Sequence, residues 1–182
     1  MPLTSRNHSV KLIAFLTALS LFLSAIEYAI PKPVPFMRLG LANLSILIGL
    51  ELLSPGNVIV LVLFKALGQG LIQGTLFSYI FLFSLAGSLA SGVIMILTKL
   101  VLGSRVTLIG ISVLGALASN SVQIILARFI IFGESAWLIA PAFFLIGTIS
   151  SATLGAISEV FYRRSQWVKL VISEGKISTE ED

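Results

Sequence analysis

The stretch Met37-Arg38-Leu39-Gly40-Leu41-Ala42-Asn43 directly follows the proline-rich segment Pro31-Lys32-Pro33-Val34-Pro35. It places a cation, Arg38, and an amide, Asn43, at the start of a strongly apolar segment. Polar side chains at such a position are costly in a membrane and normally have a partner or a function. We therefore interpret this stretch as the edge of a small polar site, and the apolar sequence around it as the frame that holds the site in the lipid.

The composition is that of an integral membrane protein. Of 182 residues, 57% are hydrophobic and 11% are charged, and the mean hydropathy is +1.04. Soluble domains carry roughly 25% charged residues. The sequence predicts one all-α transmembrane bundle over residues 1–164, followed by a charged cytoplasmic tail over residues 165–182, partly disordered at its acidic end.

Several kinds of chemistry are excluded by residue types that the chain lacks. There is no cysteine, and the single histidine, His8, precedes the first apolar run. Thiolate and histidine-cluster metal sites are therefore excluded, and we expect no cofactor. The only aspartate is Asp182, the last residue, which excludes aspartate-rich magnesium sites and aspartyl-phosphate chemistry. With no nucleophile–base pair visible either, we expect a protein that is not an enzyme.

Six apolar runs predict six transmembrane helices, at residues 10–30, 39–53, 57–67, 76–102, 106–132 and 137–162. Asn57 is the expected N-cap of the third helix, and Gly68-Gln69-Gly70 is expected to loosen its end. Lys and Arg concentrate in the segments that an N-in, C-in topology places in the cytoplasm. The net charge of +4 is therefore attributed to topology, and no nucleic-acid partner is expected.

Lys65 lies inside the third apolar run. Gln69 lies four residues further on and shares its face if the helix continues. An ionisable group at this depth normally faces a cavity or a partner. One interpretation is that Lys65 and Gln69 contact a ligand; the alternative is that Lys65 pairs with Glu27 or Glu51, or extends to the membrane interface.

The fifth apolar run carries three further polar residues. Asn120 and Gln123 lie three residues apart on one face, and Arg128 follows two turns beyond Asn120. The alternatives are hydrogen bonds between helices for the two amides, and extension to the outer interface for Arg128. With Glu27, Arg38, Asn43 and Lys65, these residues all fall in the outer half or midplane of the predicted topology, where three cations stand against one carboxylate. They predict a net positive cavity for an anionic or zwitterionic small molecule.

The chain resembles a known membrane family. Arg38-Leu39-Gly40-Leu41-Ala42-Asn43, Leu76-Phe77-Ser78 with Leu85-Ala86-Gly87, and Val113-Leu114-Gly115-Ala116 through Gln123 are similar to the heptaprenyl diphosphate synthase component I family, also called the Gx transporter family. The resemblance extends from the first predicted helix to the sixth. Prenyl chain elongation needs paired aspartate-rich motifs, which a single terminal aspartate cannot supply.

The name Gx transporter implies a fold, a partner contact and a loop that closes a pocket. A six-helix bundle of this size resembles the substrate-binding S components of energy-coupling factor transporters in the plasma membrane. There, small residues of the first helix contact a transmembrane coupling protein, and Ala14 and Ala18 match that motif. The first external loop, here residues 31–38, closes the pocket, and separate chains supply the ATPases. No residues match the ligand set of a particular vitamin-binding member.

Two functions follow as expectations. The first is a substrate-binding subunit for uptake of a vitamin, cofactor precursor or related solute, bound by Arg38, Asn43, Lys65, Gln69, Asn120, Gln123 and Arg128. The alternative is a non-catalytic membrane partner of an isoprenoid or quinone-synthesis enzyme.

Overall fold

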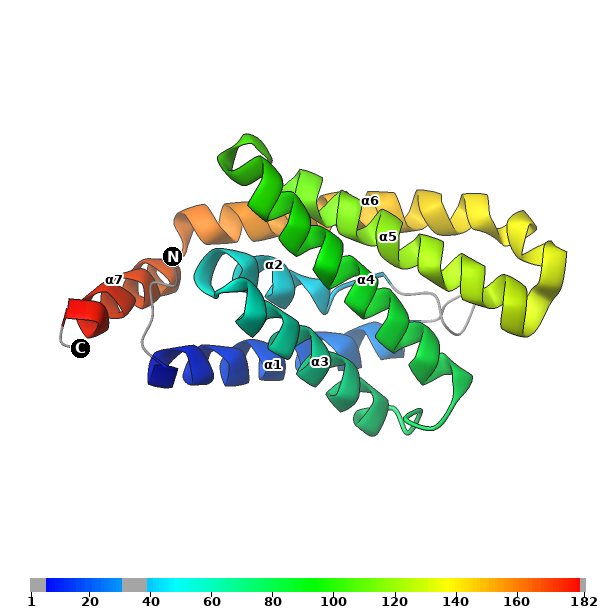
Figure 1. Cartoon of the computed structure of the whole chain (residues 1–182), viewed down its shortest axis with the longest axis horizontal. Helices are drawn as coiled ribbons and strands as arrows, with labels where there is room; N and C mark the ends of the chain where they lie inside the picture. The colour runs from blue at the N-terminus through cyan, green and yellow to red at the C-terminus, as the bar shows by residue number, and fades with distance from the viewer. Residues whose placement is uncertain (1–5, 31–38, 181–182) are drawn as a thin grey trace.

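The computed structural model describes residues 6–30 and 39–180, and these ranges are helical with short connections (Figure 1). The all-α prediction is confirmed. The helices are α1 Arg6–Ala29, α2 Asn43–Leu52, α3 Pro55–Ile72, α4 Tyr79–Leu102, α5 Leu108–Ala127, α6 Ala136–Arg164 and α7 Gln166–Glu180. A π-helical turn, Arg128–Phe132, continues α5 toward its connection with α6.

The helices form two groups that meet along the length of the bundle. α5 and α6 lie side by side as a long antiparallel pair, and α4 packs across α5 (Figure 1). α1 and α3 pack together on the other side, with the short α2 between the two groups. α1 begins and α6 ends at the same end of the bundle.

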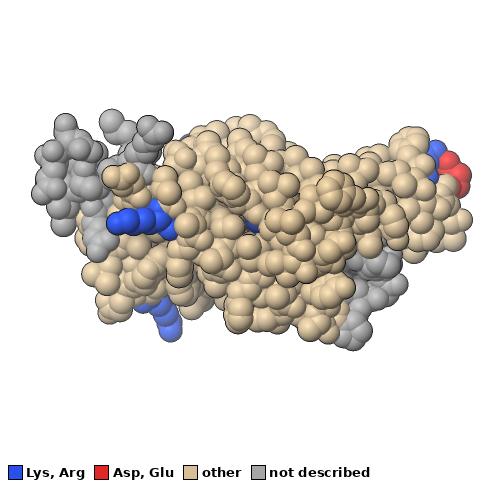
Figure 2. All heavy atoms as spheres, turned by 90° about the horizontal axis from the view of Figure 1, so that it is seen from below, with Lys and Arg blue, Asp and Glu red and all other residues tan. Residues whose placement is uncertain are grey.

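The described helices have the character of a multi-pass membrane protein. Four helical stretches are long and apolar enough to cross a membrane: Asn7–Ala29, Pro55–Ile72, Tyr79–Leu102 and Leu108–Arg164, of which the last contains both α5 and α6. Figure 2 shows one long face almost free of charged side chains. α2 has ten residues, about half of the length needed to span a bilayer. Six crossings and the N-in, C-in orientation therefore stay predictions.

Two apolar core clusters lie at different levels of α4, α5 and α6. One includes Met95 and Ile111, with Leu16, Ile46 and Leu61 from the first three helices. The other includes Phe83, Ile124, Ala127, Ala140 and Phe143. Between these levels lie buried polar residues of α4 and α5, which we call the polar layer: Ser84, Ser88, Ser91, Ser112 and Asn120.

α3 differs from its prediction at both ends. It begins at Pro55, not at Asn57, because proline at the first helical position loses no hydrogen bond and already has a helical φ. It also continues through Gly68 and Gly70 to Ile72. These glycines allow close packing: an added Cβ would lie 2.7 Å from Leu21 Cδ2 at Gly68, and 2.7 Å from Phe81 Cδ2 at Gly70.

The predicted tail contains a helix, α7. Trp167, Val168, Val171 and Ile172 recur on one side of it, and Val168 is fully buried in the first core cluster. The Trp167 ring packs on Phe15 of α1, with 5.1 Å between ring centroids. The expected partial disorder at the acidic end concerned Glu180, which is the last residue of α7, and residues 181–182, which lie outside the described ranges.

Candidate functional site

Five of the seven residues predicted to bind substrate line one buried cavity within the polar layer: Asn43, Lys65, Gln69, Asn120 and Gln123. The other lining residues are Glu27, Leu39, Gly40, Ala42, Ser88, Ser112, Ala116, Ser119, Gly147, Ser151 and Leu154. We call this space the polar cavity. Their roles as ligand contacts stay predictions, but their convergence on one space is a feature of the fold.

Lys65 lies on α3 and is only 3% exposed. Its Nζ donates a hydrogen bond to Asn43 Oδ1 at the start of α2. Gln69 lies one turn further along α3 and is equally buried, so the expected shared face is present. Glu51, one of the carboxylates considered as a partner of Lys65, instead pairs with Lys99 of α4.

Glu27, near the end of α1, was expected at the same depth as the site but was not among the residues predicted to bind substrate. Its carboxylate accepts hydrogen bonds from three consecutive backbone N–H groups: Leu39 at 2.8 Å, Gly40 at 3.1 Å and Leu41 at 2.8 Å. Gly40 has φ +88°, which glycine adopts without strain. Its freedom allows the three N–H groups to converge on one carboxylate.

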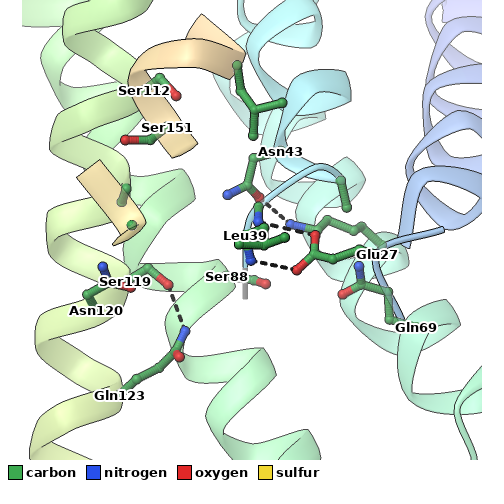
Figure 3. A pocket seen from close by; sticks show the side chains of 16 residues that line it. Glu27, Leu39, Asn43, Gln69, Ser88, Ser112, Ser119, Asn120, Gln123 and Ser151 are labelled. Carbon is green, nitrogen blue, oxygen red and sulfur yellow. Dashed lines mark hydrogen bonds between the residues drawn. The ribbon is translucent and has the colours of Figure 1, made fainter. Parts of the chain in front are cut away.

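Residues 39–43, which we call the cap segment, connect several helices through these contacts. The cap segment is held to α1 by Glu27 and to α3 by Lys65. It is also held to α6, because Ser150 Oγ donates to the Leu39 carbonyl oxygen at 2.6 Å. Figure 3 shows Glu27, Leu39, Asn43 and Gln69 on one side of the polar cavity, facing Ser119, Asn120 and Gln123.

The facing wall is built from α5 and α6. Asn120 Nδ2 donates to the Phe143 carbonyl oxygen at 3.1 Å, and Gln123 Nε2 donates to Ser119 Oγ at 2.9 Å. A Cβ at Gly147 would overlap the Asn120 amide. Gly147 therefore makes room for a polar side chain as well as for helix packing.

Arg128 does not share this cavity, and the expectation that it would do so is corrected. Its guanidinium pairs with Glu134 just beyond the π-helical turn, and it lies 5.8 Å from the ring centroids of Phe129 and Trp137. Its side chain is 39% exposed. A nearby carboxylate and two rings at the end of the helix satisfy this cation locally. Arg38 and the rest of the loop 31–38 lie outside the described residues.

The expected net positive charge is also corrected for the described residues. Glu27 and Lys65 are the only ionisable side chains among the lining residues placed by the structure, and their formal charges cancel. The cavity volume of about 40 Å³ is enough for roughly three water molecules. No group of three or more His, Cys, Asp or Glu side chains within residues 6–30 and 39–180 forms a candidate metal site.

Ala14 and Ala18 lie away from the polar cavity, on the exposed side of α1. They line an open apolar groove of about 520 Å³ between α1 and α3, together with Val10, Ile13, Thr17, Leu21, Val60 and Phe64. In a membrane-spanning helix, small residues four apart allow another helix to approach closely. Contact with a partner protein at this groove stays a prediction.

Fold and site together define a helical, multi-pass membrane protein with a largely buried polar cavity inside an apolar bundle, and the formal charges of the described lining residues cancel. The chain matches the family described as heptaprenyl diphosphate synthase component I over residues 16–161, and it belongs to that family. The family name designates a component of a synthase. No curated protein and no solved structure matches the chain.

Proposed function

We propose that this protein is the solute-binding subunit of a transport system in the plasma membrane, with both termini in the cytoplasm. One observation carries the proposal: charged and amide side chains from α1, α2, α3 and α5 line the same largely buried cavity within an apolar bundle. Buried polar groups are expensive in a membrane and mark binding sites and transport pathways. A vitamin, cofactor precursor or related small solute is the proposed ligand.

The size of the polar cavity indicates how such a ligand enters. A volume of about 40 Å³ is far below the several hundred Å³ typical of pockets for drug-sized molecules. Ligand entry therefore requires displacement of the cap segment, which Glu27, Lys65 and Ser150 hold in place. The proposed cycle alternates between this closed form and a form in which these contacts are broken.

Energy would come from separate chains. The groove at Ala14 and Ala18 is open and almost wholly apolar, which suits a transmembrane helix of a coupling protein that in turn binds ATPase subunits. The test is co-purification from membranes of the native host. A complex containing an ATPase is expected with the natural sequence, and its loss is expected with Ala14→Leu/Ala18→Leu.

Ligand binding is tested on the purified full-length protein in lipid nanodiscs. Native mass spectrometry and thermal shift are recorded with a panel of water-soluble vitamins, amino acids, polyols, monocarboxylates and prenyl diphosphates. Retention of at least one panel member, lost in Lys65→Met, is expected. Lys99→Met is the matched control, because Lys99 pairs with Glu51 outside the polar cavity. Failure of every panel member to bind would overturn the proposal.

The family match favours a second candidate, a non-catalytic membrane partner of a prenyl diphosphate synthase. A catalytic role in chain elongation is not part of this candidate, because Asp182 is the only aspartate. This function predicts a stable complex with a soluble prenyl synthase, and a change in the rate or product length of that synthase on binding. A synthase that neither binds nor changes its activity would refute it.

A further inference from the structure

The polar cavity already contains one negative and one positive side chain. Glu27 is 4% exposed and Lys65 is 3% exposed, and both line the cavity. The charged pairs Lys99–Glu51, Arg128–Glu134 and Arg163–Glu159 involve no lining residue. The charges of the described cavity wall therefore sum to zero without a ligand.

Each charge also has partners within the protein. The Glu27 carboxylate is held by three backbone N–H groups of the cap segment, and the Lys65 ammonium by the Asn43 side-chain oxygen. In a water-poor interior, an ion without a counter-charge costs several kcal/mol, and this cost exceeds the gain from a few neutral hydrogen bonds. A ligand that brings net charge would leave such an uncompensated ion inside the closed bundle.

We infer that the ligand of the polar cavity has no net charge, so that it is a zwitterion or an uncharged polar solute and not a diphosphate. The inference rests on the proposed function and specifies its substrate class. A zwitterion matches the cavity best, since its anionic group can approach Lys65 and its cationic group can approach Glu27 without changing the total charge.

An independent feature of the facing wall supports a ligand that forms hydrogen bonds. Gln123 is 2% exposed and uses Nε2 to donate to Ser119. The other end of its amide, Oε1, is buried without a hydrogen-bond partner. A buried amide oxygen without a hydrogen-bond partner destabilises the folded protein. A hydroxyl, amine or ammonium group of the ligand at this position would satisfy it, and Figure 3 shows the amide facing the cavity from α5.

The decisive experiment compares the affinities of ligands that differ in charge. The panel defined above is sorted into zwitterions, neutral solutes, monoanions and diphosphates, and dissociation constants are measured on wild type by native mass spectrometry in nanodiscs. Binding of a zwitterionic or neutral solute at least about tenfold more tightly than any anion of similar size is expected. Tighter binding of a monoanion or diphosphate overturns the inference and leaves the proposed function standing. No binding by any member overturns both.

A variant that removes one charge tests whether the charge balance of the cavity determines ligand preference. Glu27→Gln leaves the described wall with a net positive charge, so the affinity ratio of monoanion to zwitterion should rise at least about tenfold. Glu51→Gln makes the same substitution outside the cavity and should leave this ratio unchanged. An unchanged ratio in folded Glu27→Gln refutes the charge argument. If that variant does not fold, the wild-type ranking alone decides.

Discussion

The contact between Glu27 and the cap segment gives the sharpest structural prediction. In Glu27→Gln, one amide oxygen can still accept from two N–H groups, but both bonds change from charged to neutral and weaken by about 1 kcal/mol each. The third N–H meets the amide NH₂ and loses its acceptor, at a cost of about 1–2 kcal/mol. The local contact should therefore weaken by about 3 kcal/mol, a change on the order of 100-fold in the opening equilibrium.

Hydrogen–deuterium exchange with mass spectrometry measures this change directly. Peptides that cover Leu39, Gly40 and Leu41 should exchange on the order of 100-fold faster in Glu27→Gln than in wild type. Peptides from α5 and α6 should change little, because those helices pack on each other and do not depend on this carboxylate. Glu134→Gln is the control, since Glu134 is 76% exposed in its side chain and such surface pairs contribute little.

Two outcomes would refute the reasoning. If exchange at the cap segment changes less than about threefold, the three N–H bonds do not limit its opening. If α5 and α6 exchange faster by the same factor as the cap segment, Glu27 supports the whole bundle and not a local contact.

Three further predictions concern packing, charge and partner contact. Gly155→Ala should lower the melting temperature by several degrees, since its Cβ would lie 2.6 Å from the Ile109 Cα; Gly56→Ala, with nothing within 4 Å, should not. Arg128→Ala should lower the free energy of unfolding by at most about 1 kcal/mol in denaturant and leave ligand affinity unchanged. A loss of ligand binding in this variant would show that Arg128 contributes to the binding site. Ala14→Leu should abolish co-purification of the ATPase while retaining ligand binding; a complex that persists refutes the groove as the docking site.

The helices were predictable where apolar length alone determines them. Residues 76–102 and 106–132 were predicted within three residues of the observed ends of α4 and of α5 with its π-helical turn. The start of α3 was missed because proline favours the first helical position, and its end was missed because tertiary packing overrides local preference. Gly68 and Gly70 suggested a loosened helix, but the side chains of Leu21 and Phe81 occupy the space beside them, and no single-helix pattern contains that information.

The polar cavity was predictable to the extent that helical spacing places polar residues on one face. Lys65 and Gln69 share a face of α3, and Asn120 and Gln123 share a face of α5, as their spacing indicated. The hydrogen-bond partners of these buried side chains were not predictable from the sequence. Glu27 bonds to backbone groups 12 to 14 residues away, and its role depends on how the chain returns after the proline-rich segment.

The charge balance of the cavity bears on how the family name should be understood. A prenyl diphosphate carries several negative charges at neutral pH, whereas the described cavity wall offers one ammonium that is already matched by one carboxylate. The only aspartate is the last residue, so the carboxylate pairs that hold magnesium diphosphate in chain-elongating synthases have no counterpart here. If the protein does join a prenyl synthase, we expect the diphosphate to be bound by another chain of that complex. The ligand proposed for the polar cavity would explain why Lys65, Glu27 and the unpartnered Gln123 oxygen lie inside an apolar bundle, since a well-packed apolar core is often at least as stable as buried charges.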